Sequence, residues 1–495
     1  MTHLFLAIAF VATISSHAGT WEETPPFHRD IIDWVLPPTS DKPWTDQETR
    51  EFVRQRGTRS ASFLTTGLLM RNTASDVQNT ASVVRVLLTL QHNAPGEPNH
   101  GLWMTSIDPD RDRVDQNWRE FVGTGLLVAR DRFPDLLGHE IVDQIDTALL
   151  LAAEGAKARD VDAHYTNIAL MSAFLMDYVG STQNVENLME AGHAKATAIH
   201  GLFSKNKTFT EFNSPTYYGV NLMALEVWRA LAKHEDLREW GADMEASLWA
   251  DVGAFYHAGL RNVCGPFVRA NEMDMAQGTA IVGLCIGMAL NDLEATPLPA
   301  ERKDWLSYEI AYAPILSLLG VNAPSDVVPH LRQFQGDRTL QRKVPYGPYT
   351  FDVTAILKDG WMMGSGTGMR RRWDQHHPGT LHWRTPGGEV GWLLVIGENA
   401  ADCVIKNQAM QVFLSDPDPE HPLRVYVYYP DMSAETLQGS SWQLPGMSVT
   451  ATSSLQPPTV TDKDTRRHGQ VLEVSWPVSA DWDPQAPALF IRVED

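Results

Sequence analysis

The strongest constraint on the fold is a series of apolar runs with helical periodicity, which follow one another from about Thr45 to Leu319. Apolar residues at every third or fourth position mark the buried face of an α-helix. Turn-forming sequences such as Phe133-Pro134 separate the runs. Successive helices of similar length with short connections predict an (α/α) toroid of helical hairpins. The runs occupy residues 74–91, 115–132, 138–157, 164–179, 186–203, 216–232, 238–257, 273–290 and 302–319.

The pattern changes near Val344, where short alternating apolar runs divided by Gly and Pro take over. Examples are residues 393–396, 423–428 and 471–474. Such runs are typical of antiparallel strands. The 495 residues also exceed the roughly 250–300 over which a single core grows. We therefore predict an α+β multidomain protein: an (α/α) toroid catalytic domain at residues 19–320, then an antiparallel β-sandwich at residues 345–495.

The N-terminus has the pattern of a secretory signal peptide. Residues 4–14 form an apolar stretch, and Ser16-His17-Ala18 fits a small-x-small cleavage site. The stretch is too short to span a bilayer, and no other stretch is long enough. We therefore predict a signal peptide at residues 1–18, a secreted protein, and no membrane span.

The net charge of −21 argues against nucleic acid as the main partner, because phosphate binding needs a cationic surface. An acidic glycan would need only a local group of Arg, His and amide side chains. The three cysteines, Cys264, Cys285 and Cys403, cannot all pair and show no zinc spacing. His376, His377 and His382 also lack a recognisable ligand spacing. We therefore predict no metal and no cofactor.

The densest group of polar residues is Glu211-Phe212-Asn213-Ser214-Pro215-Thr216-Tyr217-Tyr218-Gly219. An amphipathic run, Val220 to Leu231, follows at once. Pro and Gly indicate a shaped loop that enters a helix, with Asn213 or Ser214 as the N-cap. A loop held by a helix is a common way to present polar groups to a ligand, although the tyrosines of a capped helix can also simply pack.

Further polar clusters lie mostly at predicted helix junctions. His92 and His100 lie in the loop 91–103, and histidine exchanges protons near neutral pH. Arg119 opens the next helix and offers a fork for a carboxylate, or equally a structural ion pair. His164-Tyr165-Thr166-Asn167 opens another helix, and Arg269 lies in a connecting loop. In a toroid of hairpins, such loops gather at one mouth of the central cavity.

This set of His, Tyr, Arg and Asn side chains suits β-elimination from a uronate sugar. An Arg or Asn can neutralise the C6 carboxylate by charge-assisted hydrogen bonds, which makes the C5 proton removable. His and Tyr can act as the base at C5 and as the acid that protonates the leaving O4. The predicted partner is therefore an acidic polysaccharide or oligosaccharide.

Segments spread in order over most of the chain resemble a known family. They are Gln91 to Trp103, Gln116 to Phe121, Tyr165 to Ser172, Phe212 to Val220, Gly265 to Met275 and His377 to Trp383. On these segments the chain resembles helical-toroid polysaccharide lyases, and more narrowly the fungal L-rhamnose-α-1,4-D-glucuronate lyases that act on gum arabic side chains. The resemblance implies a toroid with a C-terminal β domain and lyase activity. One departure is Asn271-Glu272, where the family pattern has an aromatic residue and a glycine.

We therefore predict a secreted polysaccharide lyase that cleaves a rhamnose–glucuronate type of glycan. The predicted catalytic residues transfer protons or neutralise the carboxylate: His92, His100, Tyr218, Arg119 and Asn213. The predicted substrate-binding residues shape the pocket: Tyr165, Asn167, Tyr217 and Arg269. One alternative is a glycoside hydrolase on the same toroid, with carboxylates drawn from Asp162, Glu211 and Asp274. A second alternative is a non-catalytic glycan-binding protein, which the 16 tryptophans and the departure at Asn271-Glu272 favour.

Overall fold

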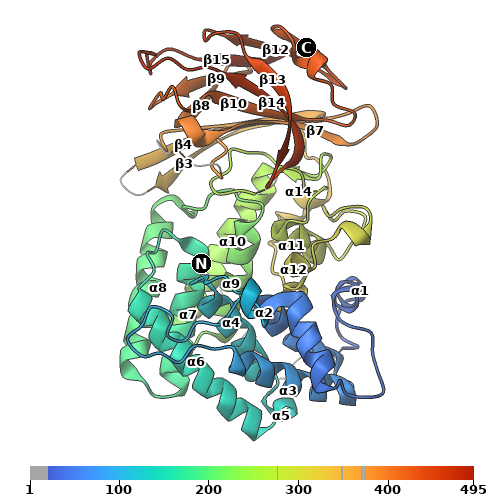
Figure 1. The fold of residues 1–495 in the computed structure, drawn as a ribbon, viewed down its shortest axis with the longest axis vertical. Helices are drawn as coiled ribbons and strands as arrows, with labels where there is room; N and C mark the ends of the chain where they lie inside the picture. Colours follow the sequence, from blue (N-terminus) through green and yellow to red (C-terminus); the bar gives the residue numbers. More distant parts are fainter. Residues whose placement is uncertain are drawn as a thin grey trace, which may run out of the picture.

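The computed structural model describes residues 21–271, 273–275, 277–346, 349–369, 372 and 375–494. The predicted signal peptide lies outside these residues, as does Glu272. Helices fill the lower half of Figure 1 and strands the upper half, with the two halves in contact. The predicted fold class, a helical toroid followed by an antiparallel β-sandwich, is confirmed.

The helical half runs from α1 to α14. Its helices are α1 (Pro26–Val35), α2 (Asp46–Arg71), α3 (Ala74–Thr89), α4 (Trp118–Arg132), α5 (Pro134–Leu137), α6 (His139–Arg159), α7 (Thr166–Thr182), α8 (Glu186–Asn206), α9 (Tyr217–Leu231), α10 (Glu235–Phe255), α11 (Ile281–Leu290), α12 (Ser307–Ile310), α13 (Ala313–Leu319) and α14 (Val328–Arg332). A two-residue pairing, β1 (Tyr256–His257) with β2 (Asn262–Val263), follows α10.

An inner ring of helices closes on itself. Helix α2 contacts α4, α4 contacts α7, α7 contacts α9, α9 contacts α13, and α13 contacts α2 again. Helices α3, α6, α8 and α10 pack outside this ring against their neighbours in the chain. The inner helices are almost wholly buried; in α7, every residue from Thr166 to Gly180 is buried. A helix that is apolar on all sides belongs in a core, which explains why α7 has its place in the inner ring.

Helix α2 is broken at Gly57, which adopts φ 73°. A positive φ is readily available to glycine but strained for a residue with a side chain. Beyond the break, the Thr58 hydroxyl donates to the carbonyl of Met104 at 2.6 Å, and the Thr58 N–H donates to the carbonyl of Thr105. The second part of α2 therefore begins at Thr58, where the segment after the loop 91–103 docks.

Two predicted helices are shorter than expected. The run at residues 273–290 becomes helical only at Ile281, because the Met275 N–H is bound by the Asn262 side chain and Asp274 makes a turn. The run at residues 302–319 divides into a 3-10 turn, α12 and α13. Pro314 at the start of α13 fits this division, since proline is tolerated in the first turn of a helix and not in its interior.

The β half contains two antiparallel sheets. Its strands are β3 (Arg338–Tyr346), β4 (Tyr349–Lys358), β5 (Trp361–Thr367), β6 (Gly379–Arg384), β7 (Val390–Val395), β8 (Ala401–Lys406), β9 (Ala409–Leu414), β10 (Leu423–Tyr428), β11 (Ser441–Leu444), β12 (Met447–Ser453), β13 (Thr459–Thr465), β14 (Gly469–Trp476) and β15 (Leu489–Val493). The larger sheet has the order β13-β14-β10-β7-β6-β5-β4-β3, and the smaller one β11-β12-β15-β9-β8.

The larger sheet joins the two halves through its two faces. Side chains such as Phe351 and Trp392 belong to the core that fills the toroid, whereas Leu393 and Val425 belong to the core between the sheets. Alternate residues of a strand point to opposite faces, so one sheet can serve both cores. All three cysteines are free and buried. None of the helices in the described part of the chain is both long and apolar enough to cross a membrane.

Candidate functional site

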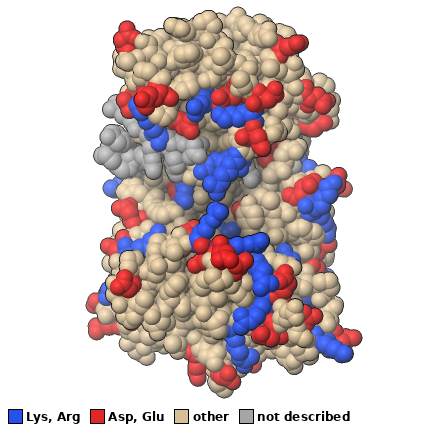
Figure 2. Space-filling view, in the orientation of Figure 1, with Lys and Arg blue, Asp and Glu red and all other residues tan. Residues whose placement is uncertain are grey.

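The first turns of the inner helices meet at one mouth of the ring. Arg59 follows the break in α2, Trp118 begins α4, Tyr165 precedes α7, Tyr217 begins α9 and Tyr312 precedes α13. Contacts described below join these residues into one site. A helix N-terminus carries unpaired N–H groups and a partial positive charge, so a ring of them favours an anionic ligand. Figure 2 shows Lys and Arg side chains gathered at mid-height, where this face of the molecule is hollowed.

Arg269 is the centre of a first group of residues, which we call the Arg269 cluster: Arg269, Glu211, Asn167, Tyr165 and Tyr217. The Arg269 guanidinium lies 4.0 Å from the centre of the Tyr217 ring and 4.6 Å from that of Tyr165. It donates to the Tyr165 hydroxyl at 3.0 Å and forms a salt bridge with Glu211. A guanidinium between two phenols places a fixed positive charge beside both hydroxyl-bearing rings.

Glu211 anchors this cluster from below. Its carboxylate accepts hydrogen bonds from the Asn167 side chain at 2.9 and 3.0 Å and from the Asn167 N–H at 3.0 Å. Burial raises the pKa of Glu211, while Arg269 and Asn167 counteract part of that rise. Both carboxylate oxygens are occupied by protein groups, so Glu211 positions Arg269 and Asn167 rather than facing a ligand.

The loop before α9 holds Tyr217 against Arg269. The Ser214 hydroxyl donates to the carbonyl of Arg269 at 2.8 Å and accepts from the Tyr217 N–H at 3.1 Å. The N-cap of α9 is Thr216, so the prediction of Asn213 or Ser214 at that position is wrong. Arg269 has φ 61°, which is uncommon for a residue with a side chain, and the bond from Ser214 helps to fix it. Burial raises the pKa of Tyr217, and the nearby Arg269 charge offsets only part of the rise.

Arg59 is the centre of a second group, the Arg59 cage, formed with Trp118, Phe121, Tyr308 and Tyr312. Its guanidinium lies 5.2 to 5.9 Å from the centres of these four rings. Among the described residues it makes no hydrogen bond and no ion pair. Burial alone would lower the pKa of Arg59, but Tyr312 and Glu309 raise it, so Arg59 stays charged.

The Arg59 cage contains further hydrogen-bond donors. The Tyr312 hydroxyl and the Trp118 indole N–H are buried and find no hydrogen-bond acceptor among the described residues. Glu309, the nearby carboxyl, has a pKa raised to about 7 by burial, so it neutralises Arg59 only in part near neutral pH. Buried polar groups normally form hydrogen bonds. Donors around a cation that have no acceptor among the described residues therefore point to an anionic or hydroxyl-bearing ligand.

The Arg59 cage and the Arg269 cluster adjoin one another. Asn117 donates to the Tyr165 hydroxyl at 3.0 Å, and its chain neighbour Trp118 lies under Arg59. Tyr312 is influenced electrostatically by Arg59 and by Tyr217. The structure thus brings together all four predicted substrate-binding residues: Tyr165, Asn167, Tyr217 and Arg269.

The predicted catalytic residues Arg119 and His100 lie in a different group. Arg119 is fully buried and donates to the carbonyl of His100 at 3.0 Å and to that of Pro98 at 2.8 Å. His100 is 6% exposed and bonds Glu154 at 3.1 Å. Arg119 therefore fixes the loop 91–103 from inside, and its guanidinium does not face the mouth. His92, half-buried in the same loop, pairs through its backbone with Gly101 and Leu102.

Asn213 and Tyr218 also make internal contacts. Asn213 has φ 54° and donates to the carbonyls of Cys264 and Pro266 at 2.6 and 3.2 Å. Tyr218 is 2% exposed, and its hydroxyl bonds that of Thr208 at 3.2 Å. Burial raises the pKa of Tyr218 well above its ordinary range. The structure brings neither residue to the Arg269 cluster, and the catalytic roles of all five remain predictions.

Arg59, Tyr308 and Tyr312 lie in none of the predicted polar clusters, while Asn117, Trp118 and Phe121 lie in the segment 116–121 without a predicted role of their own. Arg59 lies in a stretch rich in Arg and Glu that reads as a solvated helix face. Its one local signal is Gly57, which breaks the helix two residues earlier. Tyr312 lies inside a run predicted as a single helix, where nothing marks it as polar-facing.

The carboxylates required by the hydrolase alternative are dispersed. Glu211 is held by Arg269 and Asn167, Asp162 is exposed beside His164, and Asp274 is bonded to Asn262 at 2.8 Å. A hydrolase needs two carboxyl groups flanking one bond. In the described part of the chain, no group of three or more His, Cys, Asp or Glu side chains is placed to hold a metal ion.

Comparison with known proteins gives one family and distant structural likenesses. A family model described as "Domain of unknown function (DUF8769)" matches residues 42–320. No curated protein matches the chain in sequence. The chain is similar to the X-ray structure of the Streptomyces coelicolor A3 chondroitin AC lyase in complex with chondroitin sulphate, with a TM-score of 0.44 and 10% identity, over 94% of this chain and 82% of that chain. It is also similar to the crystal structure of heparinase III, with a TM-score of 0.42 and 10% identity, over 93% and 78%. At these values neither likeness bears on activity.

Proposed function

The chain belongs to the family described as a domain of unknown function (DUF8769), and we propose that it is a polysaccharide lyase that cleaves a uronate-containing glycan by β-elimination. The observation that carries the proposal is the adjacency of two groups at one ring of helix N-termini. Arg59, the Tyr312 hydroxyl and the Trp118 indole N–H, which have no acceptor among the described residues, offer a site for a carboxylate. Tyr217 beside Arg269 offers a phenol whose charge can be stabilised.

Arg59 takes the part of the carboxylate receptor in this proposal. A guanidinium binds a carboxylate through parallel N–H donors, and partial burial strengthens the pairing. Withdrawing negative charge from C6 stabilises the carbanion that develops at C5, which makes the C5 proton more acidic. Tyr312 and Trp118 add hydrogen-bond donors on the same side.

Tyr217 takes the part of both base and acid. Its phenolate removes the proton from C5, the C4–O4 bond breaks as the C4–C5 double bond forms, and the phenol proton passes to O4. Arg269, 4.0 Å from the ring centre, stabilises the phenolate between the two transfers. Tyr217 is preferred to Tyr218 for this role because Tyr218 is closed inside the core.

The narrower features of the proposal are the glycan and the compartment. We take the rhamnose–glucuronate type of glycan as the first substrate to test, because the family resemblance of the sequence segments points to it. Secretion follows from the sequence pattern of residues 1–18.

The test is the ultraviolet absorbance of the unsaturated uronate during incubation with gum arabic and a panel of other uronate glycans. Wild-type protein should generate absorbance on at least one glycan. Tyr217→Phe should abolish it, while Tyr218→Phe, the matched control, should retain it and lose about 1 kcal/mol of stability with the Thr208 hydrogen bond.

Other outcomes would replace the proposal. Reducing sugar released without absorbance would identify a glycoside hydrolase. Glycan binding without any product would identify a non-catalytic binding protein. Equal absorbance from Tyr217→Phe and wild type would move the proton transfer to another residue.

A further inference from the structure

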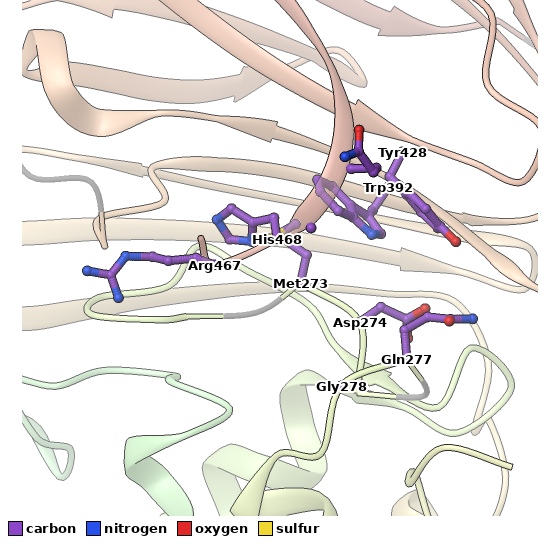
Figure 3. A pocket seen from close by; sticks show the side chains of 10 residues that line it. Met273, Asp274, Gln277, Gly278, Trp392, Tyr428, Arg467 and His468 are labelled. Atoms are coloured by element: carbon purple, nitrogen blue, oxygen red, sulfur yellow. The ribbon is translucent and has the colours of Figure 1, made fainter. Parts of the chain in front are cut away.

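A cavity of about 330 Å³ lies where the loop after Arg269 meets the larger sheet. Its volume falls within the ~300–1,000 Å³ usual for ligand pockets. Figure 3 shows Asp274 and Gln277 on one side, Trp392 and Tyr428 on the other, and Arg467 and His468 at one end. The described residues that line it come from both halves of the molecule, so it exists only in the assembled fold.

Two aromatic rings form a flat wall of this cavity. Trp392 on β7 and Tyr428 on β10 are directly opposite each other in the antiparallel register. Their rings are 5.6 Å apart with planes 22° from parallel, and the His468 ring lies 5.8 Å from that of Trp392. Paired aromatic rings of this kind present a broad apolar surface with polar edges, which matches the C–H face of a sugar ring.

Hydrogen-bond donors and acceptors surround the aromatic wall. The Asp274 carboxylate is fixed by the Asn262 amide at 2.8 Å and can accept hydrogen bonds from sugar hydroxyls. Gln277, on the same wall, is exposed and can donate or accept. Burial and the nearby Asp274 charge raise the pKa of Tyr428, so its phenol remains a donor. Asp274 and Arg467 place opposite charges in the lining, so the lining has no excess charge to select an anion, and the paired rings favour a neutral pyranose.

Side-chain hydrogen bonds link the lining of the cavity to the Arg269 cluster. Asn271 accepts hydrogen bonds from Gln375 at 2.6 Å and from Arg467 at 2.5 Å. Gln375 interacts with the Tyr217 phenol, whereas Arg467 lines the cavity. Asp274 comes five positions after Arg269, so their Cα atoms are at most about 18 Å apart. The cavity and the Arg269 cluster are therefore within about the length of a short oligosaccharide of each other.

We propose that this cavity binds a neutral pyranose unit of the same glycan whose uronate occupies the Arg59 cage. The inference rests on the proposed function for the identity of the glycan. It adds a specificity: the enzyme prefers substrates that carry a neutral sugar a few units from the uronate, and longer chains bind more tightly than the isolated reacting unit.

The test compares two substitutions at one position. Tyr428→Ala removes half of the aromatic wall, while Tyr428→Phe keeps the ring and removes only the hydroxyl. Binding of gum arabic and of its graded oligosaccharides is measured by affinity electrophoresis and calorimetry, and turnover by ultraviolet absorbance. Gln277→Ala is a second cavity variant, and Gln443→Ala, an exposed glutamine on β11, is its matched control. Thermal unfolding checks that each variant is folded.

The expected result is an affinity about tenfold lower for Tyr428→Ala with long chains, several-fold lower for Gln277→Ala and for Tyr428→Phe, which loses only the hydroxyl donor, and near wild type for Gln443→Ala. In turnover, KM should rise with kcat unchanged, and the shortest oligosaccharides should show no difference. If folded Tyr428→Ala binds long chains as tightly as wild type, the inference is overturned. If wild type still generates absorbance in that case, the lyase proposal is unaffected. Cavity-dependent binding without absorbance supports the inference and refutes the lyase. No binding by wild type to any glycan overturns both.

Discussion

Arg59 and Arg119 are both removed from bulk solvent in the helical half, yet the structure uses them in opposite ways. Arg119 is fully buried and donates to the carbonyls of Pro98 and His100. Arg59 is partly buried, and its guanidinium is surrounded by four aromatic rings and has no hydrogen bond or ion pair with any residue that the structure describes. Arg119 is held inside the core by two backbone carbonyls, and its remaining nitrogen, Nη1, is buried there without a partner among the described residues, whereas the Arg59 guanidinium lies at the mouth. A guanidinium enclosed in the core cannot also hold a substrate, so the position of an arginine and its bonded partners together decide its function.

Exchanging each arginine for methionine tests whether the two side chains have these different functions, and the expected effects are the largest. Arg59→Met should lower kcat on the uronate glycan about 10²–10³-fold, since a charge that stabilises the transition state is lost. Its free energy of unfolding should fall less than that of Arg119→Met, because the change removes contacts with aromatic rings and no hydrogen bond to a described residue. Arg119→Met should lower the free energy of unfolding by roughly 2–5 kcal/mol, because two buried carbonyls lose their donor. Denaturant titration and steady-state kinetics on both variants measure this, and the reverse pattern would contradict our interpretation.

The Arg119 region should also make stability depend on pH through Glu120. Burial raises the pKa of Glu120 to about 7, although Arg159 and Arg119 oppose the rise. Because the folded-state pKa exceeds the unfolded value, the stabilising effect is complete below about pH 4.5 and is lost as the pH rises through 7. Between pH 5 and 8 the loss is on the order of 2–3 kcal/mol. Glu120→Gln should remove most of this dependence, as measured by urea unfolding at both pH values. An unchanged slope in the variant would show that Glu120 does not cause it.

The Arg269 region should instead make activity depend on pH through Tyr217. Burial raises the pKa of Tyr217, and a base acts in its deprotonated form, so kcat/KM should rise about tenfold per pH unit from neutral pH toward that pKa. Tyr218→Phe should give the same profile as wild type. A flat or falling profile would show that Tyr217 is not the base.

The segment Glu211 to Gly219 has some features that local sequence signals predict and others that they do not. The loop and the helix behind it follow from local signals and are present, although the N-cap is Thr216 and Ser214 only bonds the Tyr217 N–H. Tyr217 and Tyr218 have the same chemistry and neighbouring positions, but a helix turns by about 100° per residue. Tyr217 therefore meets Arg269, whereas Tyr218 meets Thr208 in the core. Which tyrosine faces the ring interior depends on contacts from Arg269, more than fifty residues later, which no local pattern contains.

The sequence by itself determined the two-part architecture, because helical and strand periodicities reflect which face of each element is buried. It also identified the loops and the types of side chain at the mouth, including four residues of the Arg269 cluster: Tyr165, Asn167, Tyr217 and Arg269. Only the tertiary structure decided which side-chain hydrogen-bond donors have no acceptor among the described residues. That decision rests on distances across the ring, such as those from Arg59 to the rings of α4 and the segment before α13, and on the carbonyls that occupy Arg119. A hydrogen bond depends on distance and direction between atoms, and these are set by packing rather than by order along the chain.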